Sequence, residues 1–356
     1  MLLQRTARMR PWRRAAAILS VATLSVGLLA GCGSGSGSGS GSADRTSGDT
    51  STAAAGVFPV TVEHAFGSTK ITKAPQRVVS VGYTDDQTIL AFGVRPVGMV
   101  DQYPNPAGRS PDINTQWPWV KDKWGDTKPE VIMENGDSGP NYEKIAALRP
   151  DLIIAVYSEI DQAAYDKLSR IAPTVGRTKA EKEPFSAPWQ DNALQIAKAL
   201  GKAEDGEKMV QDTQSRLDAA RKAHPEFANE TAVALSWYKD SVAPFTSTDV
   251  RGRLLTGIGF RYQTAIDKVA GGSFYTTLSP ERIDLVDVDH IFVIGDKADT
   301  EALKKFKLFT NLDAVKNGKV TYLLDSEGPA VGAAISQGTL LSMPYAIDEL
   351  VTSAVG

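Results

Sequence analysis

The sequence predicts an α/β fold of two Rossmann-like lobes joined by a long helical segment. Short apolar runs rich in β-branched residues alternate with helical stretches, which is typical of βαβ units and mainly parallel sheets. A helical region over residues 187–223 interrupts this alternation. The first half places Glu143 eight residues before Asp151, and the second half places Glu281 eight residues before Asp289. This repeated spacing favours two related lobes.

The first 31 residues are expected to be an export signal. Arginines without acidic residues precede an apolar stretch over residues 15–30, which is too short and too poorly flanked to be preferred as a permanent membrane span. The stretch ends in Leu28-Leu29-Ala30-Gly31-Cys32, which resembles the bacterial lipobox. Cys32 is therefore the expected lipidation site, and an incidental free thiol after an ordinary signal peptide is the alternative. Arg13-Arg14 leaves export by the twin-arginine route open.

Residues 32–56 are expected to be a flexible tether. An alternating Gly-Ser run and further polar residues cannot bury a core, and the segment has a reach on the order of 25–30 Å. The signal holds five of the 39 basic residues, so its removal changes the net charge from −3 to −8. An acidic chain without a basic tract is a poor candidate for nucleic-acid binding. A single cysteine excludes an internal disulfide and cysteine-based zinc or iron–sulfur sites.

The folded part is predicted to follow the tether directly. Strands are expected at 77–81, 96–100, 152–156, 232–237, 290–294 and 320–323, with helices at 87–92, 141–148 and about 336–351. Gly201 and Gly206 are expected to bend or break the region 187–223 into at least two pieces. We therefore expect an N-terminal lobe over 57–184, a connecting helix region over 185–227 and a C-terminal lobe with a terminal helix over 228–356.

Several runs resemble those of a known family. They are Arg77-Val-Val-Ser-Val-Gly, Ile89-Leu-Ala-Phe-Gly-Val, Tyr142-Glu-Lys-Ile-Ala-Ala-Leu-Arg-Pro-Asp-Leu-Ile-Ile, Leu168-Ser-Arg-Ile-Ala-Pro-Thr and Ser279-Pro-Glu-Arg-Ile. The chain resembles the iron-siderophore and vitamin B12 type of ABC-transporter substrate-binding lipoproteins, and among them the actinobacterial ferric-siderophore binding proteins, which also carry a Trp-Pro-Trp stretch. The likeness covers about residues 57–354, with the binding domain at about 77–356. It implies two lobes bridged by one rigid helix, with the ligand between them.

Glu143 and Glu281 each lie near the start of a predicted helix, after the cap candidates Asn141 and Ser279. A carboxylate in this position offsets the positive end of the helix. The resemblance implies a second, compatible role, in which one exposed carboxylate per lobe docks onto basic pockets of a two-fold permease.

The ligand cleft is expected to be lined by loops that follow the carboxyl ends of the strands. Aromatic faces suit bulky, partly apolar chelates, and the planar fork of arginine suits negative ligand oxygens. Core packing is the alternative for each aromatic residue, and a place on a helix surface is the alternative for Arg253. The candidates are Tyr83, Tyr103, Trp117, Tyr157, Trp237, Tyr238, Arg251, Arg253 and Tyr275.

Other chemistries find little support. The histidines His64, His224 and His290 are far apart in the sequence and lie outside the loops that are predicted to line the ligand cleft. Direct zinc or manganese binding is therefore not expected. The run 334–338 imitates a nucleophile elbow, but no histidine follows position 290, and Ser336 is interpreted as a helix start. No phosphate-binding Gly-x-x-x-x-Gly-Lys motif is present.

The resemblance therefore implies a receptor rather than an enzyme. We expect a lipid-anchored monomer on the extracytoplasmic face of the cell membrane that captures a ferric siderophore and delivers it to an ABC permease dimer with its ATPase. No cofactor is expected, since iron would arrive only as the siderophore complex. The alternatives are a haem or corrinoid receptor of the same transporter class, and a surface lipoprotein that serves adhesion or scaffolding.

Overall fold

The computed structural model of the chain describes residues 57–103, 115–134, 136–181, 183–325 and 328–355. The expected export signal, Cys32 and the Gly-Ser tether lie outside these residues, so these assignments stay predictions. Within the described part of the chain, no helix combines the length and the apolar character that a membrane span requires.

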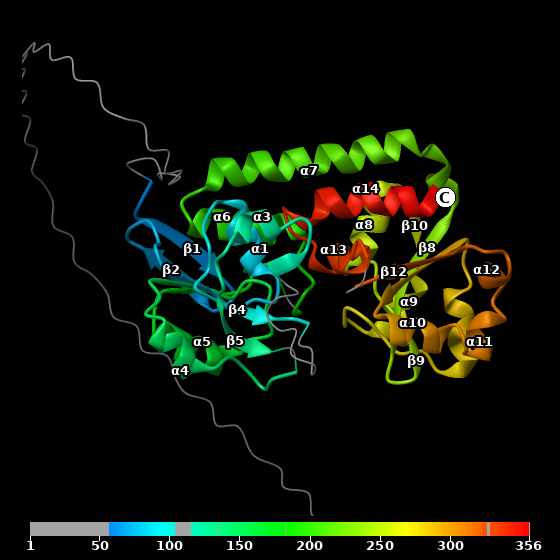
Figure 1. The fold of residues 1–356 in the computed structure, drawn as a ribbon, viewed down its shortest axis with the longest axis horizontal. Helices are drawn as coiled ribbons and strands as arrows, with labels where there is room; N and C mark the ends of the chain where they lie inside the picture. The colour runs from blue at the N-terminus through cyan, green and yellow to red at the C-terminus, as the bar shows by residue number, and fades with distance from the viewer. Residues whose placement is uncertain (1–56, 104–114, 135, 182, 326–327, 356) are drawn as a thin grey trace, which may run out of the picture. The chain divides into compact units, whose positions relative to one another are not determined.

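The first half of the described chain is built around a five-stranded parallel sheet in the order β5-β4-β3-β6-β7 (Figure 1). Its central strands are buried at every position, because they are near-continuous apolar runs covered on both faces. An antiparallel hairpin of β1 and β2 precedes the sheet. The elements are β1 Val60–His64, β2 Gly67–Ile71, β3 Val78–Ser80, α1 Asp85–Ala91, β4 Gly98–Asp101, α3 Lys121–Trp124, β5 Glu130–Glu134, α4 Tyr142–Ala147, β6 Leu152–Ile154, α5 Gln162–Ser169 and β7 Thr174–Val175.

The second half repeats this plan with a parallel sheet in the order β10-β8-β11-β12, to which β9 adds an antiparallel strand beside β8. The two α/β halves confirm the predicted fold class. The elements are η1 Pro225–Asn229, β8 Thr231–Tyr238, β9 Ser241–Pro244, α8 Val250–Ile258, β10 Arg261–Tyr262, α9 Ala265–Ala270, η2 Pro280–Val286, β11 His290–Gly295, α10 Lys297–Leu303, α11 Lys307–Thr310, α12 Asp313–Lys316 and β12 Val320–Leu324.

Two helices connect the halves. They are α6 Trp189–Ala199 and the 21-residue α7 Ala203–Ala223, which packs against α6 and against helices of the second half, α8 and α14 (Figure 1). Gly201 has a φ of +69° and separates them, as predicted. The expectation that Gly206 also breaks the helix was wrong. Gly206 lies inside α7, where an added Cβ would come within 2.5 Å of the Ala197 Cβ, so it lets α6 and α7 approach closely.

The C-terminal helix is divided, contrary to the prediction of one helix over about 336–351. The two pieces are α13 Val331–Gln337 and α14 Ser342–Val355. Gly338 adopts the left-handed conformation with a φ of +56° and ends α13. Ser336 is buried in the last turn of α13, so its interpretation as a helix start was wrong. The apolar residues 331–335, which are also buried, form the earlier part of that helix.

The repeated spacing of Glu143 and Asp151, and of Glu281 and Asp289, has a structural basis. Oxygens of the Asp151 carboxylate accept hydrogen bonds from the backbone N–H groups of Gln76 and Arg77, just before β3, at 2.8–3.0 Å. The Asp289 carboxylate accepts one from Thr231 at the start of β8, at 2.7 Å. Asp151 directly precedes β6, which pairs with β3, and Asp289 directly precedes β11, which pairs with β8. Each carboxylate therefore links the starts of two neighbouring strands.

Candidate functional site

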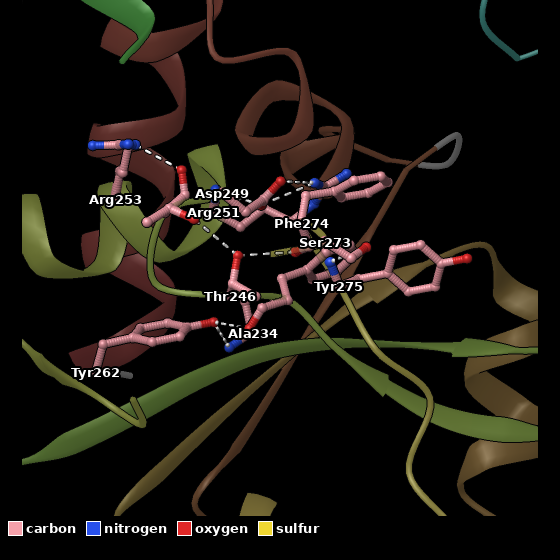
Figure 2. Close-up of polar contacts among 11 residues, drawn as sticks. Ala234, Thr246, Asp249, Arg251, Arg253, Tyr262, Ser273, Phe274 and Tyr275 are labelled. Carbon is pink, nitrogen blue, oxygen red and sulfur yellow. Dashed lines mark hydrogen bonds and ion pairs between the residues drawn. The ribbon is translucent and has the colours of Figure 1, made fainter. Parts of the chain in front are cut away.

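A buried ion pair lies at the start of α8 (Figure 2). Asp249 is the N-cap of this helix, and its carboxylate accepts a hydrogen bond from the backbone of Arg251 at 2.9 Å. The Nη1 atom of Arg251 donates to both carboxylate oxygens of Asp249 at 3.0 and 3.1 Å. The guanidinium lies 3.9 Å from the ring centre of Phe245. Its Nε atom finds no acceptor among the described residues.

Tyr103 and Tyr157 of the first half and Asp325 of the second face this charge. Each follows the carboxyl end of a parallel strand, β4, β6 or β12, as the cleft hypothesis requires. Burial raises the pKa of both tyrosine hydroxyls above its ordinary value, and the positive charge of Arg251 opposes that increase. Burial also raises the pKa of the Asp325 carboxyl to about 7, and the positive charge of Arg251 again opposes that increase. The tyrosines are therefore neutral hydrogen-bond donors at physiological pH.

A row of aromatic rings extends from the first half to the second. Phe185 lies at its centre, with ring centroids 4.7 Å from Tyr157, 5.8 Å from Tyr83 and 5.4 Å from Phe274. Phe274 contacts Tyr275 at 4.8 Å. We call this set the aromatic row, which continues to Tyr238 at 5.9 Å from Tyr275 and so comprises Tyr83, Tyr157, Phe185, Phe274, Tyr275 and Tyr238.

The other candidates are placed differently. Trp117 is buried and meets Tyr103 edge-on at 5.3 Å, and its indole N–H has no acceptor in the described ranges. The ring of Trp237 lies 5.1 Å from that of Phe306. Because successive residues of a strand point to opposite faces, Trp237 and the next residue, Tyr238, lie on opposite faces of β8. Arg253 donates from Nε and Nη2 to backbone carbonyls of Thr248 and Ser186 at 2.7 and 3.0 Å. The structure thus groups Arg251 with Tyr103 and Tyr157, and directs the fork of Arg253 to the backbone.

A buried amide network joins α1 to α13. The side chain of Gln87 donates to Gln337 at 2.8 Å and accepts from the indole of Trp119 at 2.9 Å and the hydroxyl of Thr339 at 3.0 Å. Gln337 also donates to Gln102. Nothing in the local sequence marks these glutamines, because the partners come from segments about 250 residues apart.

Asp85 positions Tyr157. Its buried carboxylate accepts the backbone N–H groups of Val156 and Tyr157 at 2.7 and 3.0 Å, and burial raises its pKa to about 6. A Cβ at Gly82 would lie 2.0 Å from a carboxylate oxygen of Asp85, so only glycine leaves room for this contact. The sequence alone did not identify this role.

The surface has hollows both near this group of residues and away from it. A small cavity of about 20 Å³ adjoins Tyr157, Phe185, Val250 and Gln337, and so draws on both halves. A hollow of about 330 Å³ lies at the strand ends of the first sheet beside Tyr83. A hollow of about 910 Å³ lies at the strand starts of the second sheet, lined by residues such as Thr231, Arg261 and Asp289. Its place at the amino ends argues against it as the ligand site.

Metal ligands do not gather in the part of the chain that the structure describes, where no group of three or more His, Cys, Asp or Glu side chains is arranged to hold an ion. His64 and His290 are buried against hydroxyls of Thr69 and Thr321. His224 contacts Glu226 at 2.9 Å.

Glu143 and Glu281 are both exposed in the first turn of a helix. Asn141 caps α4 by accepting the backbone N–H of Lys144 at 3.0 Å, as expected. In the second half the element is a 3₁₀ helix, η2. The pKa of Glu281 is lowered by its own backbone N–H and by a hydrogen bond with Ser279. Each half thus presents one exposed carboxylate at a helix start.

Comparison with known proteins gives a consistent result. Residues 99–327 match the family model described as "Periplasmic binding protein". The chain is 29% identical to a probable siderophore-binding lipoprotein, YfiY, of Bacillus subtilis, over 72% of this chain and 78% of the relative. It is 30% identical to a putative ABC transporter substrate-binding lipoprotein, YhfQ, of the same organism, over 74% and 80%. The crystal structure of PiaA from Streptococcus pneumoniae in complex with ferrichrome matches with a TM-score of 0.67 and 28% identity, covering 83% of this chain and 97% of PiaA.

Proposed function

Because the chain belongs to the periplasmic binding protein family, we propose that it is the substrate-binding component of an ABC importer and that it captures a ferric siderophore. A siderophore-binding lipoprotein and a protein crystallised with ferrichrome stand among its relatives, which supports this ligand class. The observation that carries the proposal is the group of Arg251, Tyr103 and Tyr157. It combines a fixed positive charge at the start of α8 in the second half with two neutral hydroxyl donors at strand ends of the first half.

Arg251 supplies the main polar contact in this proposal. Asp249 holds one nitrogen, and the guanidinium lies over the ring of Phe245, so these two contacts restrict the direction of the remaining N–H groups. The Nε–H donates to a negative oxygen of the chelate, and a planar fork suits a carboxylate, catecholate or hydroxamate oxygen. Tyr103 and Tyr157 donate their hydroxyl protons to neighbouring oxygens. The iron stays within its chelator, and no protein atom coordinates it.

The aromatic row supplies the apolar contact. Tyrosine and phenylalanine rings offer large faces with few rotatable bonds, so little conformational entropy is lost when a chelate packs against them. Trp117 extends this surface beside Tyr103. Trp237, Tyr238 and Tyr275 remain candidate ligand contacts.

Delivery requires two further features. Glu143 and Glu281 dock onto basic pockets of the permease dimer, one carboxylate from each half. A lipid on Cys32 holds the protein, as a monomer, at the extracytoplasmic face of the membrane, and residues 33–56 serve as its tether. In this scheme the protein binds and hands over its ligand without making or breaking a bond in it.

Titration followed by tryptophan fluorescence tests the proposal, since Trp117 and Trp119 stack at 5.1 Å beside Tyr103. The panel comprises a ferric hydroxamate, a ferric catecholate, ferric citrate, haem and cobalamin. We expect quenching at micromolar concentration by at least one ferric chelate. Quenching by haem or cobalamin alone would assign the protein to the alternative receptor class. No response to any of the five would contradict the receptor function and leave an adhesion or scaffold role.

A further inference from the structure

Phe185 has an unusual backbone. It lies in the segment between β7 and α6, and its φ of +66° belongs to the left-handed region. A bulky side chain is rarely found there, because its Cβ approaches the following carbonyl oxygen. Such a conformation persists only where the surrounding structure determines it, and it is common at ligand-binding sites.

Two charged side chains lie against this segment. The carboxylate of Glu181 is buried near the backbone N–H groups of Phe185, Ser186 and Ala187. Burial raises the pKa of Glu181 to about 7, and Arg177 opposes that shift. From α8 in the second half, the Nη2 atom of Arg253 donates to the carbonyl of Ser186 at 3.0 Å. The segment is thus fixed from both halves of the chain.

The ring of Phe185 connects the ligand candidates of the two halves. Its centroid lies 4.7 Å from Tyr157 and 5.4 Å from Phe274, and the ring borders the small cavity that Val250 and Gln337 also line. A chelate held by Tyr157 would therefore lie close to this ring. Core packing alone would not require a left-handed backbone, since an extended or helical residue can bury a ring equally well.

We propose that Phe185 is a specificity-determining contact for the apolar face of the ligand, and that Glu181 and Arg253 are positioning residues that hold its ring in place. The inference rests on the proposed receptor function and deepens it. It also gives Arg253 an indirect role, since the fork of this residue is directed to the backbone of Ser186 and Thr248 rather than to a ligand.

Phe185→Gly tests the contact, because glycine adopts a positive φ without strain while the ring is removed. Loss of the buried ring leaves a cavity, so we expect the melting temperature to fall, and we expect the affinity of the folded variant for the ferric chelate that binds in the fluorescence panel to fall about tenfold or more. Phe66→Leu is the matched control. Its ring stacks on Tyr165 at 4.9 Å in the first half, so its loss should lower the melting temperature and leave the affinity unchanged.

The outcomes separate the two proposals. If the wild-type protein binds no member of the panel, the receptor function fails, and this inference fails with it. If the wild type binds and Phe185→Gly binds equally well, only the role of Phe185 is wrong. Phe185→Leu, which keeps apolar bulk, serves the same comparison if the glycine variant does not fold.

A double-mutant cycle tests the positioning residues. Glu181→Ala and Arg253→Ala should each lower affinity about fivefold in the wild-type background and have no effect in the Phe185→Gly background, because their action passes through the ring. Glu181→Gln, which keeps one acceptor oxygen, should restore part of the loss. Equal losses in both backgrounds would contradict the positioning role and indicate direct ligand contact or a general structural effect.

Discussion

Asp249 holds Arg251 from one side only. The two carboxylate oxygens engage Nη1 at 3.0 and 3.1 Å, whereas Nε has no acceptor among the residues that the structure describes. Asp249 is fully buried, and the Arg251 side chain is 16% exposed. Since a buried donor without an acceptor is unfavourable, a ligand oxygen that reached this N–H group would form a favourable hydrogen bond with it.

Arg251→Lys should weaken ligand binding about 30- to 100-fold. Lysine keeps the charge beside Asp249 but lacks the planar fork and the Nε–H, so a charge-assisted hydrogen bond of about 2–3 kcal/mol is lost. Fluorescence titration measures the affinity, and Arg216→Lys on exposed α7 is the control. Wild-type affinity in Arg251→Lys would show that the ligand does not use this guanidinium.

The paired change Glu143→Ala with Glu281→Ala should lower uptake by cells and leave ligand affinity unchanged. Both carboxylates are exposed and lie in different halves, so their removal affects a docking surface and not the cleft. Uptake of a radiolabelled ferric chelate and titration of the purified protein measure the two quantities. Glu204→Ala with Glu207→Ala on α7 removes the same charge elsewhere. An equal fall in affinity would overturn the docking assignment.

Gln87→Leu should lower the free energy of unfolding by about 2–3 kcal/mol. The change leaves the indole of Trp119 and the amide of Gln337 without their partner in a buried setting. Gln337→Leu added to it should cost less than the sum of the single changes, because both act on one network. Urea unfolding measures the effect, with exposed Gln162→Leu as the control. Additive losses would mean that the two glutamines act independently.

Asp86→Asn should change the pH dependence of stability. Burial, with a contribution from the Asp85 charge, raises the pKa of Asp86 to about 8, and burial raises that of Asp85 to about 6. The folded chain therefore favours the protonated carboxyls, unfolding releases protons, and stability falls as the pH rises from about 4 to 8.

The asparagine variant should lose less stability over this pH range than the wild type, by at least about 2 kcal/mol. Urea unfolding at several pH values measures the difference, and exposed Asp122→Asn is the control. Parallel curves for Asp86→Asn and the wild type would show that burial does not raise the pKa of this carboxyl in the folded protein.

The sequence predicts the fold well where short-range pattern decides. Apolar β-branched runs gave β3, β8, β11 and β12 within a few residues, and Gly201 ended α6. The prediction failed for Gly206 and Ser336, because their roles depend on Ala197 in a neighbouring helix and on the left-handed Gly338 that follows α13. Close packing between helices leaves no signature in a local window.

The same limit applies to the site. Strand-end reasoning selected Tyr103 and Tyr157, which follow β4 and β6, and the structure places Arg251 of α8 near them. Their role as ligand contacts stays a prediction. It did not identify Phe185 or Gln87. A phenylalanine in an irregular segment and a glutamine in a helix acquire meaning only from Tyr157, Phe274 and Gln337, which are distant in sequence.

The helix α7 has a mechanical consequence. At 1.5 Å per residue its 21 residues extend about 30 Å, and it contacts helices of both halves along that length. A hinge needs a few residues that can change φ and ψ freely, whereas a change of angle within α7 would break consecutive i→i−4 hydrogen bonds. A stiff helix of this kind would keep Glu143 and Glu281, the two carboxylates that we propose to dock onto the permease, at a nearly constant spacing. The transporter would then distinguish the ligand-bound receptor by the conformation of side chains near the ligand, and not by a large rotation of one half relative to the other.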